Sequence, residues 1–274
     1  MMNTEQPTAG TLLRHWRRQR RLSQMALALE AGISQRHLSC LEAERARPSR
    51  AMVLHLTEQL RVPLRERNAI LVAAGFAPVF RERPLQAPEL AAARQAMERI
   101  LHGHSPHPAL AVDRHWTLIS ANEAVFALLG GMSGPLMQPP VNVLRLSLHP
   151  DGLAPRILNF AEWRAHLLAR LAHEVQASAD AMLLRLLEEL KAYAWPPQAR
   201  GTRATPPGEA SIAVPLRLAG AEGPLSFLST TTVFGTAVDV TLAEVTIESF
   251  FPADEVTALA MTRLIKGVEV NELR

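Results

Sequence analysis

Apolar residues in the first eighty positions recur at the spacing of short amphipathic helices. Residues 8–20 place two leucines and a tryptophan on one side of a predicted helix. A fifth helix is expected to begin at Pro63 and to end near Gly75. Between these two, three more apolar patterns each follow a serine that can cap a helix: Ser23, Ser34 and Ser49. The pattern predicts an all-α N-terminal domain.

The stretch from residue 23 to 42 joins two of these helices at a single glycine. Gly32 can end the first helix sharply, and Leu38 and Leu41 share the buried face of the second. The opposite face of that second helix carries Gln35, Arg36 and Ser39. Gln and Arg side chains can make paired hydrogen bonds to base edges in a major groove. The arrangement therefore predicts a helix-turn-helix whose second helix reads DNA.

Beyond residue 76 the pattern changes to a mixture of strands and helices. Three prolines in residues 77–88 predict a connector. Strands are expected within residues 108–121 and at 211–218, 225–234 and 240–250, and helices at 89–102, 122–129, 160–175, 180–193 and after residue 254. This order favours an α+β domain with an antiparallel sheet and helices across one face. We expect a helix-turn-helix domain over 1–80, a linker and connecting helix over 81–103, and a second domain over 104–274.

Charge divides the chain in the same place. Residues 1–83 carry 14 arginines and 7 glutamates, a net charge of +7, whereas residues 84–274 have a net charge of −4. A basic module is the electrostatic footprint of a nucleic-acid-binding domain. Three arginines that follow the predicted reading helix are placed to touch the DNA backbone: Arg45, Arg47 and Arg50.

Localisation is expected to be cytoplasmic. The one cysteine, Cys40, excludes an internal disulfide and fits a reducing compartment. The chain has no apolar run of about eighteen residues and its first residues do not resemble a secretory signal, so no membrane association is expected.

The N-terminal pattern resembles the XRE (Cro/repressor-like) family of regulators. The resemblance is carried by the helix-turn-helix itself, by the run LEAERARPS at residues 41–49, and by upstream positions: Leu13, Arg14, Arg17, Arg20 and Leu22. It implies that Gln24 holds a phosphate, that Arg17 pairs with Glu42, and that Gln35, Arg36 and Ser39 face bases. One position departs from the family, because Glu44 stands where a glycine is usual. A left-handed backbone costs energy at such a residue.

Three segments of the second half look like the C-terminal ligand-binding domain of MmyB-like transcription regulators. They are HGHSPHPALAVDRHWTLISAN, NVLRLSLHPDGLAPRILNFAEWRAHLLARL and STTTVFGTAVDVTLAEVTIESFFPAD. The resemblance implies a PAS-like fold with an apolar pocket and a possible fatty-acid-like ligand. Aromatic candidates for its lining are Trp116, Phe126, Phe160, Trp163, Phe227 and Phe234, although aromatic residues of this kind are more often plain core. A polar anchor could come from Arg145, Arg156, Arg164 or His149, and the sequence does not choose among them.

Other kinds of site find little support. His102, His104 and His107 form a histidine cluster near Asp113, but the cluster crosses a proline-broken loop and lacks a second pair of ligands, so no metal is expected. Walker, zincin, nucleophile-elbow and dinucleotide-binding motifs are absent from the sequence. We therefore expect no catalytic residues, no certain cofactor and no enzyme activity.

These patterns together predict a sequence-specific, DNA-binding transcription regulator. Its expected partners are double-stranded DNA, a second copy of the chain in a homodimer, and a small apolar ligand that controls it. One alternative is that the C-terminal domain serves only dimerisation or docking of a partner protein. Another is an antitoxin-like DNA binder, but the long second domain argues against it.

Overall fold

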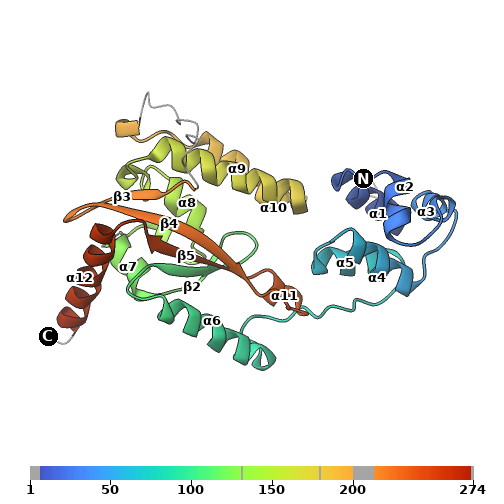
Figure 1. The fold of residues 1–274 in the computed structure, drawn as a ribbon, viewed down its shortest axis with the longest axis horizontal. Coiled ribbons are helices and arrows are strands. Elements are labelled where there is room, and N and C mark those ends of the chain that lie inside the picture. Colours follow the sequence, from blue (N-terminus) through green and yellow to red (C-terminus); the bar gives the residue numbers. More distant parts are fainter. Residues whose placement is uncertain (1–6, 131, 179, 200–212, 273–274) are drawn as a thin grey trace. The chain divides into compact units, whose positions relative to one another are not determined.

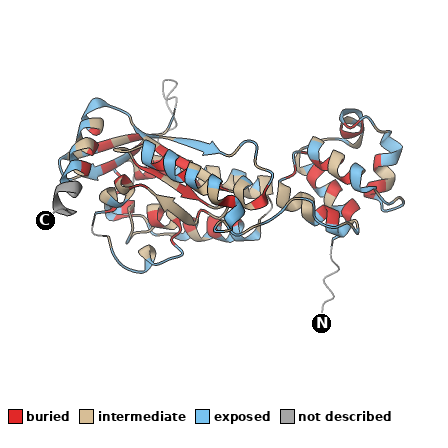
Figure 2. Cartoon of the chain, turned by 90° about the horizontal axis from the view of Figure 1, so that it is seen from below, coloured by how far each residue is buried: buried red, intermediate tan, exposed pale blue. Residues whose placement is uncertain are grey.

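The structure is a computed structural model that describes residues 7–130, 132–178, 180–199 and 213–272. It divides into two compact units. The first extends to Pro84 and also contains Thr236–Ala243, while the second is formed by Leu85–Gly235 and the chain from Glu244 onward. Each unit has its own buried interior, with exposed residues on the outer faces of its helices (Figure 2).

The described N-terminal part of the first unit, up to Pro84, is a bundle of five short helices (Figure 1). They are α1 (Ala9–Gln19), α2 (Gln24–Glu30), α3 (Gln35–Glu42), α4 (Arg50–Gln59) and α5 (Leu64–Ala73). The expected serine caps are present, because each hydroxyl accepts a hydrogen bond from the backbone N–H three residues further on, at Ser23, Ser34 and Ser49. Leu13, Trp16, Leu38, Leu56 and Leu71 are among the apolar residues in its core. The prediction of an all-α helix-turn-helix domain is confirmed.

Two turns of this unit use left-handed backbone. Gly32 has φ +63° after α2, as expected for a glycine that ends a helix. Glu44 has φ +60° after α3, so the family's usual turn is kept although a glycine is missing. Its carboxylate accepts hydrogen bonds from the hydroxyls of Thr8 and Thr11 at the start of α1. These contacts offset part of the cost of the left-handed conformation at Glu44.

A short segment that precedes the last strand belongs to the first unit. It contains α11 (Val240–Ala243), although a strand was expected from residue 240. The expectation was wrong here because Asp239 begins a helical turn: its carboxylate accepts from the Thr241 N–H at 3.0 Å. The segment is held on the connector by a 2.9 Å ion pair between Arg83 Nη1 and Asp239 Oδ2, and by the Val240 N–H, which donates to the Arg81 carbonyl at 2.8 Å.

The second unit is built on a five-stranded antiparallel sheet in the order β2-β1-β5-β4-β3. Its strands are β1 (Ala109–Val112), β2 (Leu118–Ala121), β3 (Leu216–Gly220), β4 (Gly223–Val233) and β5 (Thr246–Pro252). Of the strand expected over 211–218, residues 211–212 lie outside the described part of the chain, and β3 begins only at Leu216.

Helices cover both faces of this sheet (Figure 1). They are α6 (Ala91–Gly103), α7 (Glu123–Leu129), α8 (Val143–Leu148), α9 (Phe160–Ser178), α10 (Ala181–Ala192) and α12 (Glu255–Glu272), with 3-10 turns at Pro88–Leu90, Pro135–Met137, Ala154–Arg156 and Pro197–Ala199. Met97 and Leu101 of α6 pack on one face, against Ile247 of β5. Helices α8 and α9 lie over the other face, which Glu248 and Phe250 share because side chains alternate along a strand. The domain is α+β and PAS-like, as predicted.

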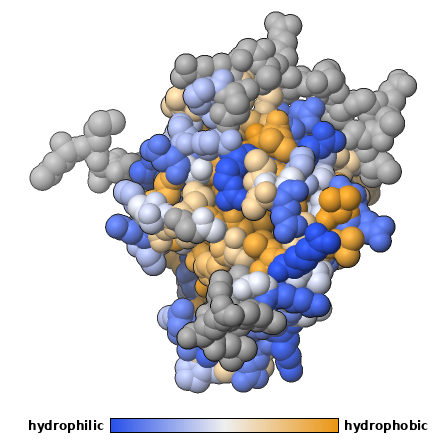
Figure 3. All heavy atoms as spheres, turned by 90° about the vertical axis from the view of Figure 1, so that its left-hand side faces the viewer, coloured by the Kyte–Doolittle hydropathy of each residue, from blue (hydrophilic) through white to orange (hydrophobic). Residues whose placement is uncertain are grey.

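Hydrophobic side chains also reach the surface of this unit. On the side shown in Figure 3, orange apolar residues gather between blue polar ones. The exposed apolar residues of the unit include Val256 and Leu259 on α12 and Phe126 on α7. Among the described residues, no helix has the length and apolar character needed to cross a membrane.

Candidate functional site

Helix α3 presents a polar face to solvent. Gln35 and Arg36 are exposed and Ser39 is half-buried, whereas Leu38 and Leu41 on the opposite side are almost completely buried. The Ser34 hydroxyl caps the helix by accepting from the His37 N–H at 3.1 Å. His37 is also exposed in the first turn, and the sequence analysis did not single it out. Its place in the first turn after the Ser34 cap, next to Arg36, is the signal that could have included it.

A buried ion pair fixes the other end of α3. Arg17 Nε donates to Glu42 Oε1 at 2.6 Å and Arg17 Nη2 donates to Glu42 Oε2 at 2.7 Å, which makes a two-point contact. Burial raises the pKa of Glu42, but hydrogen bonds from Arg17 and Gln24 and the charges of Arg17 and Arg14 outweigh it and hold the pKa below its ordinary value. The pairing that the resemblance implied is therefore confirmed. It anchors α3 to α1.

The residues expected at DNA phosphates lie around this helix. Gln24 is half-buried, and its Nε2 donates one hydrogen bond to Glu42 Oε2 at 2.8 Å. An amide nitrogen has two N–H groups, so one more donor remains on this side chain. Arg45, Arg47 and Arg50 are exposed in the loop after α3 and at the start of α4. The contacts of these four residues with DNA stay a prediction.

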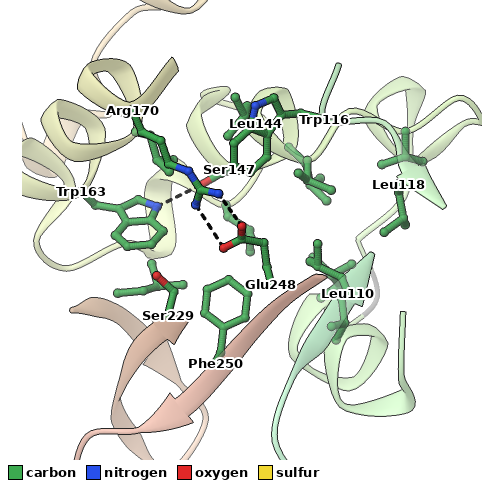
Figure 4. Close-up of a pocket in the computed structure, with 18 of the residues that line it drawn as sticks. Leu110, Trp116, Leu118, Leu144, Ser147, Trp163, Arg170, Ser229, Glu248 and Phe250 are labelled. Atoms are coloured by element: carbon green, nitrogen blue, oxygen red, sulfur yellow. Dashed lines mark hydrogen bonds and ion pairs between the residues drawn. The ribbon is translucent and has the colours of Figure 1, made fainter. Parts of the chain in front are cut away.

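A cavity of about 110 Å³ lies in the second unit, between the sheet and helices α8 and α9 (Figure 4). Its wall is mainly aliphatic and aromatic. The residues that line it are Leu110, Trp116, Leu118, Val125, Leu129, Met137, Val141, Val143, Leu144, Leu146, Ser147, Leu153, Trp163, His166, Leu167, Arg170, Leu216, Ser229, Glu248 and Phe250. Such an apolar chamber with a few polar groups is the usual form of a small-molecule site.

One arginine and two carboxylates form a connected cluster, of which Arg170 and Glu248 lie on the wall of this cavity. Arg170 of α9 donates to both carboxylate oxygens of Glu248, at 2.6 and 3.1 Å (Figure 4). Its Nε lies 3.4 Å from Glu174 Oε1, and its guanidinium stacks on Trp116 with 4.5 Å to the ring centroid. The Trp116 Nε1–H in turn donates to Glu174 Oε2 at 2.7 Å. All four side chains are thus held in place before any ligand binds.

Known families match both units. A family model described as the MmyB-like transcription regulator ligand binding domain matches residues 93–264, more than half of the chain. The chain belongs to the MmyB-like transcription regulators. A second family model, described as a helix-turn-helix domain, matches residues 8–70. A search of curated proteins finds no match. This MmyB-like regulator is therefore a DNA-binding transcription regulator with a ligand-binding domain.

The aromatic residues expected in the pocket of the regulator divide into two groups. Trp116 and Trp163 line the cavity (Figure 4). The other four lie elsewhere: Phe160 and Phe227 are fully buried in the core, Phe126 is 53% exposed on α7, and Phe234 packs against the α6 side of the sheet. The alternative of plain core therefore describes Phe160 and Phe227, whose neighbours fill the space around them.

None of the four anchors considered from the sequence lies on the described wall of the cavity. Arg145 makes a two-point ion pair with Glu189, and Arg156 donates to the Leu128 carbonyl at 2.7 Å. Arg164 stacks on Trp195 and donates to the Lys191 carbonyl at 2.8 Å. His149 packs against the Tyr193 ring. The charged residues that do line it are Arg170 and Glu248, neither of which was predicted from the sequence.

The histidine cluster is held by backbone contacts. His102 Nδ1 lies 3.1 Å from the Glu98 carbonyl, and His104 Nε2 lies 3.1 Å from the Phe250 carbonyl. Burial, and to a smaller extent repulsion from His104, lowers the pKa of His107. Within the part of the chain that the structure describes, no group of three or more His, Cys, Asp or Glu side chains is arranged to hold a metal ion.

Proposed function

We propose that this MmyB-like regulator binds duplex DNA sequence-specifically, with α3 in the major groove. Gln35, Arg36 and Ser39 would contact base edges. The observation that carries the proposal is the exposed polar face of α3 on a helix fixed by the buried pair of Arg17 and Glu42. A reading helix must be held rigidly if its hydrogen bonds are to discriminate bases.

Phosphate contacts would set the position of the helix on the duplex. We propose that Gln24, Arg45, Arg47 and Arg50 supply them, because the three arginines are exposed around α3 and Gln24 retains a donor. One short helix reads few bases, so we also propose a homodimer on two half-sites about 34–36 Å apart. The lone cysteine, Cys40, is consistent with action in a reducing cytoplasm.

The cavity of the second unit would bind a small apolar ligand with a fatty-acid-like chain. A water needs about 10–15 Å³ of such space, so a cavity of about 110 Å³ holds roughly eight groups of that size. A methylene group and a water have similar volumes. We therefore propose a chain of about eight carbons.

Ligand occupancy would control DNA binding through β5. This strand carries Glu248 and Phe250 on the cavity wall. It begins at Thr246, and two residues join it to the segment that contains α11. Asp239 of that segment pairs with Arg83 in the connector of the first unit. A ligand that favours one position of β5 would bias this segment, since a ligand shifts an equilibrium by its differential affinity for the two states.

The test begins with selection of bound duplexes from a random pool. Titration of the selected duplex at fixed salt, with and without 1-octanol, then measures operator affinity and its response to an apolar chain. A preference for the selected duplex over a scrambled one supports DNA reading, and a shift with octanol supports ligand control. If octanol does not bind, the alternative in which the second domain serves only dimerisation or docking is favoured. If octanol binds without any shift in operator affinity, ligand control of DNA binding is wrong.

A further inference from the structure

The polar groups on the cavity wall bear on which ligand head group this regulator accepts. A carboxylate buried in an apolar chamber needs a cation or several donors, because an unpaired buried charge is strongly unfavourable. Within the described residues, Arg170 is the one permanently charged cation on the wall. A ligand carboxylate could therefore be accepted only if Arg170 can pair with it.

Arg170 is already paired with two protein carboxylates. Its two terminal nitrogens donate to Glu248, its Nε faces Glu174 at 3.4 Å, and the Trp116 ring covers its face. Glu248 has a side chain that is only 5% exposed, so its pairing with Arg170 is protected from water. A ligand carboxylate would have to displace Glu248 and leave that carboxylate buried without its partner.

The two carboxylates are engaged in their turn, which also disfavours a cationic head group. Glu248 Oε1 accepts a second hydrogen bond from the Thr231 hydroxyl at 3.1 Å, and Glu174 Oε2 accepts from the Trp116 indole N–H at 2.7 Å. Their charges are directed at Arg170 and not at the open cavity. An ammonium group would find no carboxylate that is not already shared.

Uncharged polar groups remain for a ligand. The Ser147 hydroxyl accepts from the Trp163 indole N–H at 3.1 Å and keeps its own O–H to donate. The hydroxyl of Ser229 and the ring nitrogens of His166 have no hydrogen-bond partner within the described part of the chain. Burial, and then repulsion from Arg170, lowers the pKa of His166 and so favours its neutral ring, which has one donor and one acceptor nitrogen. These three side chains can donate to and accept from a neutral head group.

We propose that the effector is a medium-length apolar chain with an uncharged hydrogen-bonding head group, such as an alcohol or a primary amide, and not a carboxylate. This inference rests on the proposed ligand-binding function and specifies its chemistry. Ser147, Ser229 and His166 bind the head group. The ion pair of Arg170 and Glu248 excludes a carboxylate by neutralising the one cation that could receive it.

The test compares three probes with the same chain: 1-octanol, octanamide and octanoate. Binding to the full-length protein is measured by calorimetry at pH 8, where octanoate is fully ionised. We expect octanol and octanamide to bind at least about tenfold more tightly than octanoate. Octanoate binding as tightly as octanol overturns the inference while leaving an apolar-ligand function in place. If none of the three probes binds, the proposed ligand function itself fails, and this inference with it.

A substitution tests the part played by Glu248. Glu248→Gln removes one negative charge at nearly constant shape, so the positive charge of Arg170 is less fully compensated. The affinity for octanoate should therefore rise at least about tenfold relative to the affinity for octanol. The matched control is Glu188→Gln on the exposed surface of α10, which should leave the order of the three probes unchanged. If the folded Glu248→Gln variant binds the three probes with the same relative affinities as the parent, the ion pair of Arg170 and Glu248 does not exclude carboxylates. The comparison in the parent protein is decisive by itself if that variant does not fold.

Discussion

Arg17 of α1 and Glu42 of α3 meet in the core of the first unit, with Nε and Oε1 2.6 Å apart and side chains that are 10% and 0% exposed. Gln24, at the start of α2, donates to the same carboxylate. Three helices therefore converge on one buried charge at the C-terminal end of the reading helix. The pair connects folding to function, because it orients α3 without contributing to its exposed face.

Removing the carboxylate should destabilise the first unit strongly. Glu42→Ala leaves the Arg17 guanidinium buried without its partner, and we expect the free energy of unfolding to fall by about 3–5 kcal/mol. Urea unfolding followed by circular dichroism measures the change. Glu30→Ala, at an exposed position of α2, is the control and should stay within about 0.5 kcal/mol of the parent. If Glu42→Ala loses no more unfolding free energy than the control variant, the ion pair does not stabilise the first unit.

The contribution of Glu42 should depend on pH in a defined direction. Its pKa is lower in the folded protein than in the unfolded chain, so its contribution is complete above the unfolded value of about 4.3. The contribution is lost as the pH falls through the lowered folded pKa. The difference in unfolding free energy between parent and Glu42→Ala should therefore be largest near pH 7 and narrow below about pH 4. A difference that stays constant from pH 7 to pH 3 argues against this assignment.

Base recognition by α3 is tested at its exposed arginine. Arg36→Ala should weaken binding to the selected duplex by about 1–3 kcal/mol if Arg36 makes a paired contact with a base. Titrations at matched salt measure the loss. Arg185→Ala, on the exposed face of α10, removes the same charge from the second unit and should leave affinity nearly unchanged. Equal affinities of parent and Arg36→Ala would rule out this role for Arg36.

A phosphate contact has a different signature. Arg47→Gln should weaken binding to selected and scrambled duplexes by similar factors, because a phosphate carries no sequence information. The slope of log affinity against log salt concentration should become shallower by about one unit. The measurement is a series of titrations from low to moderate salt. A loss confined to the selected duplex would instead make Arg47 a base-reading residue.

Communication between ligand and DNA is tested at Asp239. Asp239→Asn weakens the ion pair with Arg83 and leaves the cavity wall intact. We expect octanol to bind the variant as tightly as the parent but to change operator affinity less. Calorimetry and DNA titration together separate the two effects. An undiminished response of DNA binding to octanol would show that this contact does not transmit the signal.

Much of the fold follows from local patterns in the sequence. The helix-turn-helix is encoded by serine caps, a glycine and leucines within about twenty residues, so no long-range contact is needed to recognise it. The α11 segment was different. Val245 continues the alternation of Ile247 in β5 and Leu242 adds a further apolar residue before it, so the sequence pattern resembles a longer strand. Only the docking of Asp239 on the connector shows why the chain turns into a helix there.

The polar part of the pocket could not be predicted in the same way. Glu248 occupies a polar position in an alternating strand, which indicates a solvated face, yet it is 4% exposed. Arg170 and Glu174 have the spacing of an ordinary surface pair on a helix. Their meeting with Glu248, 78 residues away in the case of Arg170, depends on the register of β5 beneath α9. Strand register and helix docking are tertiary properties that a single sequence does not display.

Competition between duplexes shows whether α3 reads base sequence. A labelled duplex selected by the protein is bound at fixed salt and challenged with unlabelled copies of itself or of a scrambled duplex of the same composition. We predict that the scrambled duplex needs a concentration at least about 10³ times higher to displace the label, which is typical of specific recognition. If both competitors displace the label at the same concentration, α3 does not read base sequence.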